Sequence, residues 1–188
     1  MSRHSTAFLR GPRVILRAHT EADLDSWSGW FNDPVLTEGI YKGLFPNTVE
    51  KQRRFLSSMY NDEANLQLAI EHEESGRLIG TIGLHAIDFF HATAAISILI
   101  GERDFWRKGF GKEALSLILM HSFEKLCLEK LTSGMYSENI ASRKLFASIG
   151  FTQEATLRSQ VKWRGKRIDV YKYGLLVAEW RAKAAIKE

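Results

Sequence analysis

The sequence predicts an α+β protein in which a central sheet of about seven strands is covered by helices. It has 188 residues, of which 45% are apolar and 11% aromatic, enough for one sizeable hydrophobic core. Short alternating or β-branched segments, typical of strands, are interspersed with longer segments whose apolar residues recur every three or four positions. Because no repeat, linker or low-complexity tract interrupts this pattern, we expect one domain over residues 1–188.

The expected elements follow in chain order. Seven segments have the pattern of strands: 13–17, 66–71, 78–84, 92–100, 130–136, one from 151 onward, and 168–177. Four segments have the periodicity of packed helices: 20–31, 48–60, 114–126 and 140–148. Residues 35–47 have neither pattern and are expected to be irregular, and 181–187 is expected to be a solvated helical tail.

Local signals support several of these boundaries. Thr20 followed by Asp23 has the spacing of a capping box at the start of the first helix, and Pro34 follows the end of that helix. The turn at 72–77 (HEESGR) joins two strands as an antiparallel pair, and residues 163–166 join the last two strands.

The most informative stretch is Ile96 to Ala114 (ISILIGERDFWRKGFGKEA), where a strand is followed by a loop and a helix start. Gly109 and Gly111 allow the backbone to approach a ligand closely, and the N–H groups of the first helical turn point outward at the positive end of the helix dipole. Such a site binds phosphate. Three cations of the same turn add positive charge: Arg107, Lys108 and Lys112.

Other phosphate-binding motifs fit this stretch less well. A P-loop is excluded, because Trp106 and Glu113 occupy the positions that require glycine and Ser or Thr. The run from Gly109 to Ala114 formally fits a dinucleotide fingerprint, but it follows its strand only after ERDFWRK, and the strand 130–136 does not end in an acidic residue. That interpretation and an ordinary glycine-containing loop remain as alternatives.

Four separate segments resemble one known family in order and spacing. They are IGTIGL (79–84), ILIGERDFWRKGFGKEAL (98–115), ENIASRKLFASIGF (138–151) and LRSQVKWRGKRIDVYKYGLLVAEW (157–180), with LRAHTEADLDSWSGWFNDP (16–34) at the start. Together they resemble the RimJ/RimL-type ribosomal-protein N-acetyltransferases of the GNAT superfamily over nearly the whole chain. The resemblance implies the GNAT fold, an α/β/α layered arrangement whose mixed sheet splays between its fourth and fifth strands and has helices on both faces.

The resemblance also implies acetyl-CoA as cosubstrate, an amine as acceptor, and no metal. In this family, backbone groups of the fourth strand hold the pantetheine arm and the thioester carbonyl, the glycine loop holds the pyrophosphate, and an asparagine after the fifth strand contacts the cofactor. The cofactor-binding residues implied here are Ile98, Leu99, Ile100, Arg107, Lys108, Gly109, Phe110, Gly111, Lys112, Asn139 and Ser142. Asn139 is alternatively an ordinary helix N-cap.

Two departures from the family leave the catalytic groups open. Phe146 stands where many relatives carry a tyrosine that protonates the leaving thiolate. Ala94 and Ala95 stand where several relatives carry a glutamate that acts as the general base. Ser142, with Asn139 beside it, is the remaining candidate on the thiolate side.

The candidate bases are His85, His91 and Asp88, which we expect to cluster between the third and fourth strands. A surface histidine without a catalytic role is the alternative at this hairpin. The spacing of these residues gives no metal-ligand pattern.

A missing base favours a weakly basic acceptor. A lysine-like amine, with a pKa of about 10.4, is neutral in only about one molecule in 10³ at pH 7, whereas an α-amine near 8 is neutral far more often. We therefore expect a protein N-terminal α-amine or an amino-sugar nucleotide, with a polyamine or aminoglycoside as the alternative acceptor. A non-catalytic acyl-CoA-binding sensor or interaction module is the alternative function.

The remaining expectations concern surroundings and partners. A net charge of +4 without a long basic run argues against a nucleic-acid partner. The single cysteine, Cys127, excludes an internal disulfide, is expected to be packed on a helix face, and fits a reducing cytoplasm. No signal peptide or membrane span is visible.

The protein is expected to be a monomer or a homodimer, with Trp163 and Tyr171 of the final hairpin exposed. By the family resemblance, the acceptor site is lined by Trp30, Tyr41 and Phe45, which are alternatively core aromatics.

Overall fold

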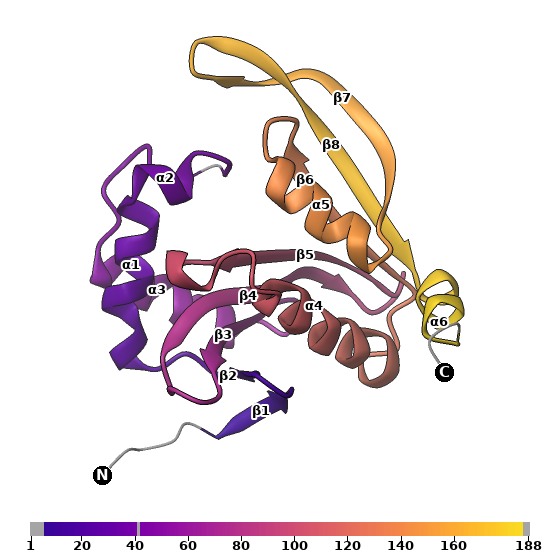
Figure 1. The fold of residues 1–188 in the computed structure, drawn as a ribbon, viewed down its shortest axis with the longest axis horizontal. Coiled ribbons are helices and arrows are strands. Elements are labelled where there is room, and N and C mark those ends of the chain that lie inside the picture. The colour runs from indigo at the N-terminus through magenta and orange to yellow at the C-terminus, as the bar shows by residue number, and fades with distance from the viewer. Residues whose placement is uncertain (1–5, 41, 186–188) are drawn as a thin grey trace.

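Within residues 6–40 and 42–185, which the computed structural model describes, eight strands form one mixed sheet (Figure 1). They are β1 (Ala7–Arg10), β2 (Val14–Arg17), β3 (Leu66–His72), β4 (Leu78–Asp88), β5 (Thr93–Ile100), β6 (Lys130–Tyr136), β7 (Thr152–Trp163) and β8 (Lys166–Leu176). Their spatial order is β1-β2-β3-β4-β5-β6-β8-β7. Only β5 and β6 are parallel, and every other neighbouring pair is antiparallel.

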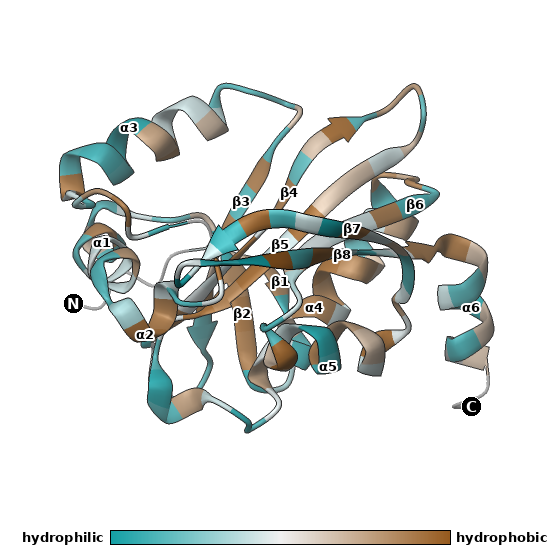
Figure 2. Cartoon of the chain, turned by 90° about the horizontal axis from the view of Figure 1, so that it is seen from above, coloured by the Kyte–Doolittle hydropathy of each residue, from teal (hydrophilic) through white to brown (hydrophobic). Residues whose placement is uncertain are grey.

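Helices cover both faces of this sheet, as predicted. The helices α1 (Leu24–Asn32), α2 (Pro34–Thr37) and α3 (Val49–Tyr60) lie on one face, α4 (Phe110–Met120) and α5 (Ile140–Ile149) lie on the other, and α6 (Val177–Ala185) lies at the C-terminal end. The larger core is packed under α4 and α5, and the smaller one under α1 and α3. Figure 2 shows hydrophobic residues concentrated along the strands between these two layers.

The strand β5 contributes to both cores because successive side chains of a strand point to opposite faces. Ile96, Ile98 and Ile100 pack against the larger core, whereas Leu99 packs against the smaller one. This alternation defines the two faces used below: the α4–α5 face, which carries the glycine loop, and the α1–α3 face.

The sheet opens between β5 and β6. These strands pair only from Thr93 to Ala95, opposite 130–132, and a last contact joins the Ser133 hydroxyl to the Ile96 carbonyl at 3.0 Å. Beyond it, β5 stays paired with β4 up to Ile100, while β6 stays paired with β8 up to Tyr136. This is the splay between strands 92–100 and 130–136 that the family resemblance implies.

Several details differ from the sequence-based expectations. The sheet has an eighth strand, β1, among the described residues, and the short helix α2 lies in the region expected to be irregular. The helix expected at 114–126 begins at Phe110 and ends in a π-helical turn over residues 121–125.

One expectation in the C-terminal half was wrong and another is confirmed. Cys127 is exposed and follows the π-helical turn with a φ of 53°, so it does not pack on a helix face. The expected helical tail is the end of α6, where Arg181, Ala182 and Ala185 are exposed. Residues 186 and 187 of that tail lie outside the described residues.

A buried polar network fixes α1 to the sheet. The Arg17 guanidinium donates to Asp23 at 2.7 Å and to Glu71 at 2.5 Å, and Asp23 accepts the Thr20 backbone N–H at 2.7 Å, as a capping box requires. His19 is buried beside this network and stacks on Trp27 at 4.1 Å between ring centroids. Burial lowers the pKa of His19 from 6.5 to about 4, so the ring is neutral in the folded protein at pH 7.

This lowered pKa predicts a stability that falls with acidification. Below pH 6.5 the unfolded chain binds a proton at His19 that the folded protein binds only near pH 4, so the free energy of unfolding decreases over this window by up to about 3 kcal/mol. Urea unfolding at pH 7, 5.5 and 4.5 measures this slope, and His19→Gln should remove most of it. The lowered pKa values of His85 and His121 leave a smaller residual slope of the same sign.

The control for this prediction is the exposed hairpin variant His91→Gln, which should keep the slope. Equal slopes in the wild type and in His19→Gln would contradict the prediction.

Candidate active site

The glycine loop lies where β5 ends and α4 begins. Gly109 is the N-cap of α4 and has a φ of 89°, a left-handed conformation in which a side chain is strained. No side chain caps α4, so the N–H groups of its first turn have no capping partner. The structure therefore places a bare helix N-terminus directly after the splayed strand.

The second glycine has a different role from the first. A Cβ added at Gly111 would make ordinary contacts with Leu145, Ile100 and Ile98, at 3.4, 3.6 and 3.8 Å. Gly111 therefore packs the start of α4 against both β5 and α5. The backbone of the loop, the splayed strand and the second helix thus meet at one point.

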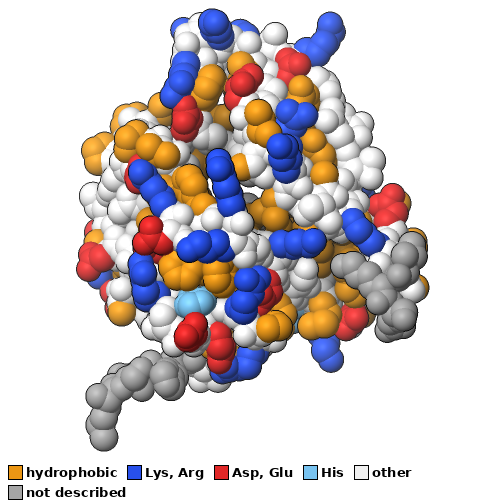
Figure 3. Space-filling view, viewed as in Figure 1, with side chains coloured by type: hydrophobic (Ala, Val, Ile, Leu, Met, Phe, Trp, Pro, Cys, Tyr) orange, Lys and Arg blue, Asp and Glu red, His pale blue; other side chains and the backbone are white. Residues whose placement is uncertain are grey.

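Positive charge surrounds this helix start. Arg107, Lys108 and Lys112 are all exposed, and none forms an ion pair with another described residue. Figure 3 shows Lys and Arg side chains spread over the face on which α4 lies. The side chain of Phe110, in contrast, is buried in the core, so only its backbone belongs to the loop surface.

A clamp from the N-terminal part of the chain holds the loop. The Arg13 guanidinium donates to the Lys108 carbonyl at 3.1 Å and to Glu113 at 2.9 Å, and it lies 4.7 Å from the Phe110 ring centroid. Glu113 also accepts the backbone N–H groups of Arg13 and Val14, at 2.7 and 3.1 Å. The sequence analysis missed this clamp, because about 100 residues separate its partners.

The backbone of β5 alternates between its two neighbours. The carbonyls of Ala94 and Ile96 accept hydrogen bonds from side chains of β6, at 3.4 and 3.0 Å. By the same alternation, the polar groups of Ile98 and Ile100 face the opening, and those of Leu99 face β4, where its carbonyl lies against Gly80.

One side chain already uses this open edge of β5. The Trp106 indole N–H donates to the Ile100 carbonyl at 2.8 Å. Trp106 was not among the predicted site residues. Of the three predicted β5 residues, Ile98 and Ile100 are therefore better placed than Leu99 to meet a ligand in the opening.

Asn139 caps α5 and also holds the segment after α2. Its Oδ1 accepts the Ser142 backbone N–H at 3.1 Å, which is the N-cap interaction. Its Nδ2 donates to the Gly39 carbonyl at 3.2 Å. The cap therefore exists, and a cofactor or catalytic role for Asn139 and Ser142 stays a prediction.

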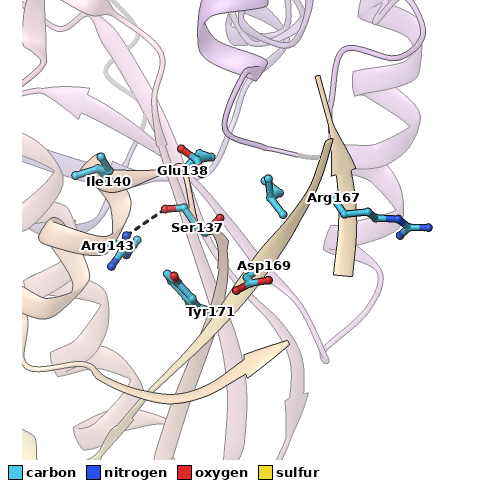
Figure 4. A pocket seen from close by; sticks show the side chains of 8 residues that line it. Ser137, Glu138, Ile140, Arg143, Arg167, Asp169 and Tyr171 are labelled. Atoms are coloured by element: carbon cyan, nitrogen blue, oxygen red, sulfur yellow. Dashed lines mark hydrogen bonds between the residues drawn. The ribbon is translucent and has the colours of Figure 1, made fainter. Parts of the chain in front are cut away.

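A pocket of about 450 Å³ adjoins the start of α5 and the ends of β6 and β8 (Figure 4). It is lined by Ser137, Glu138, Ile140, Arg143, Arg167, Ile168, Asp169 and Tyr171. Arg143 donates to the Ser137 carbonyl at 3.1 Å and lies over the ring of Tyr171, which is half-buried rather than exposed. Trp163 is also half-buried. Figure 4 shows the Arg167 side chain pointing away from these groups.

The three candidate bases do not lie in one cluster. A bulge separates His85 from Asp88 within β4, and Ala86 between them has a φ of 49°. Asp88 binds His91 at 2.8 Å at the exposed hairpin tip, whereas His85 Nε2 lies 2.7 Å from the Ser97 hydroxyl.

His85 is the candidate base that the structure brings to the opening. Ser97 follows Ile96 directly and is exposed on the α1–α3 face, at the point where β5 leaves β6. Burial, and to a lesser degree the charge of Lys42, lower the pKa of His85 below 6.5. The sequence analysis missed Ser97, although pairing β4 with β5 in the correct register would have placed it beside His85.

The aromatic residues expected at the acceptor site lie in different surroundings. Trp30 is buried, packs on Gly101, and donates to Glu102 at 3.1 Å, so it is a core residue. Phe45 is 78% exposed in the loop before α3. Tyr41 lies outside the described residues.

Two segments meet beside the α1–α3 face, the one after α2 and the tip of the β7–β8 hairpin; we call them the roof. The Trp163 indole N–H donates to the Glu38 carbonyl at 2.7 Å, and Arg164 forms an ion pair with the Glu38 carboxylate. Figure 1 shows the β7–β8 hairpin extending past α5 toward α2. The hairpin tip and the segment after α2 therefore meet at Glu38.

Among the described residues, no three His, Cys, Asp or Glu side chains are grouped so that they could bind a metal ion. The described helices include none that is long and apolar enough to cross a membrane.

Known proteins resemble this arrangement in sequence and in fold. The profile of the acetyltransferase (GNAT) domain matches residues 13–152. The chain belongs to the GNAT family of acetyltransferases. The GNAT chain is 34% identical over 173 residues to the uncharacterized N-acetyltransferase p20 of Bacillus licheniformis, covering 89% of this chain and 95% of that protein. It is 29% identical over 175 residues to the uncharacterized N-acetyltransferase YoaA of Bacillus subtilis (strain 168), covering 89% and 96%.

A solved GNAT structure shares the fold of this chain. The spermidine N-acetyltransferase from Vibrio cholerae, in complex with CoA and spermine, superimposes with a TM-score of 0.83 at 22% identity, covering 91% of this GNAT chain and 99% of that chain. At this identity the similarity shows the fold alone. As a member of this family, the protein is an acetyltransferase, and GNAT acetyltransferases use acetyl-CoA.

The left-handed Gly109 gives a direct test of the loop. Gly109→Ala imposes a backbone strain of about 1–2 kcal/mol at the start of α4, and we expect acetyl-CoA to bind about tenfold more weakly in isothermal titration calorimetry. Gly76→Ala is the matched control, because Gly76 has a φ of 64° with nothing within 4 Å of an added Cβ, and it lies in the turn between β3 and β4. Similar losses of binding in both variants would contradict a specific role for the loop.

Proposed function

We propose that this protein transfers an acetyl group from acetyl-CoA directly to a primary amine of low basicity. The favoured acceptors are a protein N-terminal α-amine and an amino-sugar nucleotide. The observation that carries the proposal is the opening between β5 and β6, which has the bare N-terminus of α4 on one face and the His85–Ser97 pair on the other.

The donor side is proposed to hold acetyl-CoA, which supplies the reactive thioester. The free N–H groups at the start of α4, together with Arg107, Lys108 and Lys112, suit its pyrophosphate. The outward-facing polar groups of Ile98 and Ile100 suit the amides of an extended arm. Backbone donors in such an opening also stabilise the negative charge that develops on the carbonyl oxygen during transfer.

On the acceptor side, we assign His85 as the base and Ser97 as the group that connects it to the amine. Ser97 accepts the proton that the acceptor ammonium loses, and its own hydroxyl proton passes to His85 Nε2 at 2.7 Å. The neutral amine then forms the C–N bond with the acetyl carbon while the C–S bond breaks. A base with a lowered pKa is weak, and it therefore suits an amine of low basicity.

The leaving sulfur is proposed to meet Ser142 and Asn139 at the start of α5. The Ser142 hydroxyl passes to the thiolate the proton that the attacking nitrogen loses, in place of the tyrosine that Phe146 replaces. Since a thiol has a pKa of about 8.5, thiolate leaves readily, and the missing acid costs only about the 10² lower end of general-acid catalysis.

The finer assignments remain part of this proposal. They are the RimJ/RimL-type group, one domain over 1–188, a monomer or homodimer, and a cytoplasmic location. The single cysteine supports the last of these, since reduced thiols are usual there.

The function is tested by measuring the thiol released from acetyl-CoA in the presence of each member of a panel of acceptors. The panel contains Ala- and Ser-initiated peptides, an amino-sugar nucleotide, spermidine and an aminoglycoside. We expect the peptide or the amino-sugar nucleotide to give the highest kcat/KM at pH 7. Spermidine or the aminoglycoside as the best acceptor would refute the low-basicity argument. Binding of acetyl-CoA without thiol release on any acceptor would favour the non-catalytic sensor.

The assignment of His85 predicts a particular pH profile with the best acceptor of the panel. In the wild type, log kcat/KM should rise with pH through a pKa below 6.5, because His85 must be neutral to accept a proton. His85→Gln should lose that limb and about 10²-fold or more in rate, and Ser97→Ala should also be slowed.

The matched control is His121→Gln, because burial lowers the pKa of His121 as well but it lies at the far end of α4. If His85→Gln kept the acidic limb, another group would be the base.

A further inference from the structure

We infer that the acceptor site recognises an amine that also carries a negatively charged group, phosphate or carboxylate, through the ammonium groups of Lys42 and Lys172. This inference rests on the proposed function and narrows its acceptor. Both lysines belong to the α1–α3 side of the opening, Lys172 on its floor and Lys42 in the roof segment after α2.

Lys172 reaches across β6 toward the opening. It lies on β8 directly opposite Gly134 of β6, and its Nζ and Cδ lie 3.2 and 3.6 Å from the position that a Cβ at Gly134 would occupy. The missing side chain at Gly134 leaves room for the lysine to lie flat on the strand. The Lys172 ammonium thus lies over β6, about one strand spacing (about 4.8 Å) from its own strand, β8, and next to the edge of β6 that faces β5.

Lys42 approaches the same site from the roof. Its Nζ lies 5.4 Å from the centroid of the Phe31 ring on α1, and its charge is close enough to act on His85. Lys42 and Lys172 therefore come from different elements, the segment after α2 and β8, on the side of the sheet where His85 pairs with Ser97.

Four carboxylates on elements that border this face have cationic partners. Glu38 pairs with Arg164, Glu154 with Lys130, Asp33 with Arg103, and Asp88 with His91. Within the described residues, neither Lys42 nor Lys172 forms an ion pair. The site therefore offers two uncompensated positive charges.

This charge distribution separates the present chain from an enzyme for polycations. A polyamine would place further ammonium groups near Lys42 and Lys172, neither of which has a carboxylate partner among the described residues. An anionic group on the acceptor would instead form charge-assisted hydrogen bonds with the same two lysines. Such a group should therefore raise affinity for the acceptor without changing the binding of acetyl-CoA, whose pyrophosphate is assigned to the α4 loop.

The test compares matched acceptors that differ only in charge. Glucosamine 1-phosphate is set against glucosamine, and the peptide amide Ser-Glu-Glu against Ser-Gln-Gln and Ser-Lys-Lys, so the two arms distinguish phosphate from carboxylate. We expect the anionic member of at least one arm to exceed its neutral partner about tenfold in kcat/KM, with the preference decreasing as salt is added. The double variant Lys42→Gln/Lys172→Gln should reduce this ratio to near one.

The control is Lys125→Gln, an exposed lysine beyond the far end of α4, which should keep the preference. The KM for acetyl-CoA should be the same in all three proteins. An equal or better neutral or cationic acceptor in both arms, or an unchanged ratio in the double variant, would overturn the anion site while leaving the acetyltransferase intact.

A binding measurement keeps the inference testable without turnover. With the protein saturated with CoA, calorimetric titration should show glucosamine 1-phosphate or Ser-Glu-Glu binding to the wild type, and about tenfold weaker binding to the double variant. The failure of both ligands to bind the wild type better than the double variant would refute the anion site. Absence of thiol release with intact anion binding would refute only the transferase function.

Discussion

The structure depends on one constraint of backbone hydrogen bonding: β5 must leave β6 after Ile96 while it stays paired with β4. Polar backbone groups seldom remain without partners, so those of Ile98 and Ile100 need partners from outside the sheet. Trp106 supplies one for Ile100. The first turn of α4 adds further unpaired N–H groups beside them. The candidate site therefore consists largely of main-chain groups that the fold itself leaves unsatisfied.

An opening of this kind persists only if the elements on each side are held independently. The Arg13–Glu113 clamp fixes the glycine loop to β2, and the Asn139–Gly39 contact fixes α5 to the segment after α2. The Glu38–Trp163 contact completes the roof. Each joins segments far apart in the chain, so the position of the site is set by tertiary contacts more than by the strands that border it.

Sequence reasoning succeeded where the cause is local. The glycine-containing loop between β5 and α4 was predicted, and the cap formed by Asn139 was the alternative to its cofactor role; both arise within a few residues. Arg13 and Ser97 were missed because their partners come from distant segments, and only the strand register makes Ser97 a neighbour of His85. Cys127 was placed wrongly because helical periodicity gave no sign of the π-helical turn that ends the helix before it.

The two faces of the sheet carry different halves of the proposed reaction. The α4 loop lies on one face and Ser97 on the other, with the opening between β5 and β6 connecting them. Two substrates that enter from opposite faces do not compete for the same entrance, so both can be bound at the same time. Such a layout favours a ternary complex with either order of addition, and it lets the acetylated product and the spent thiol leave through separate exits.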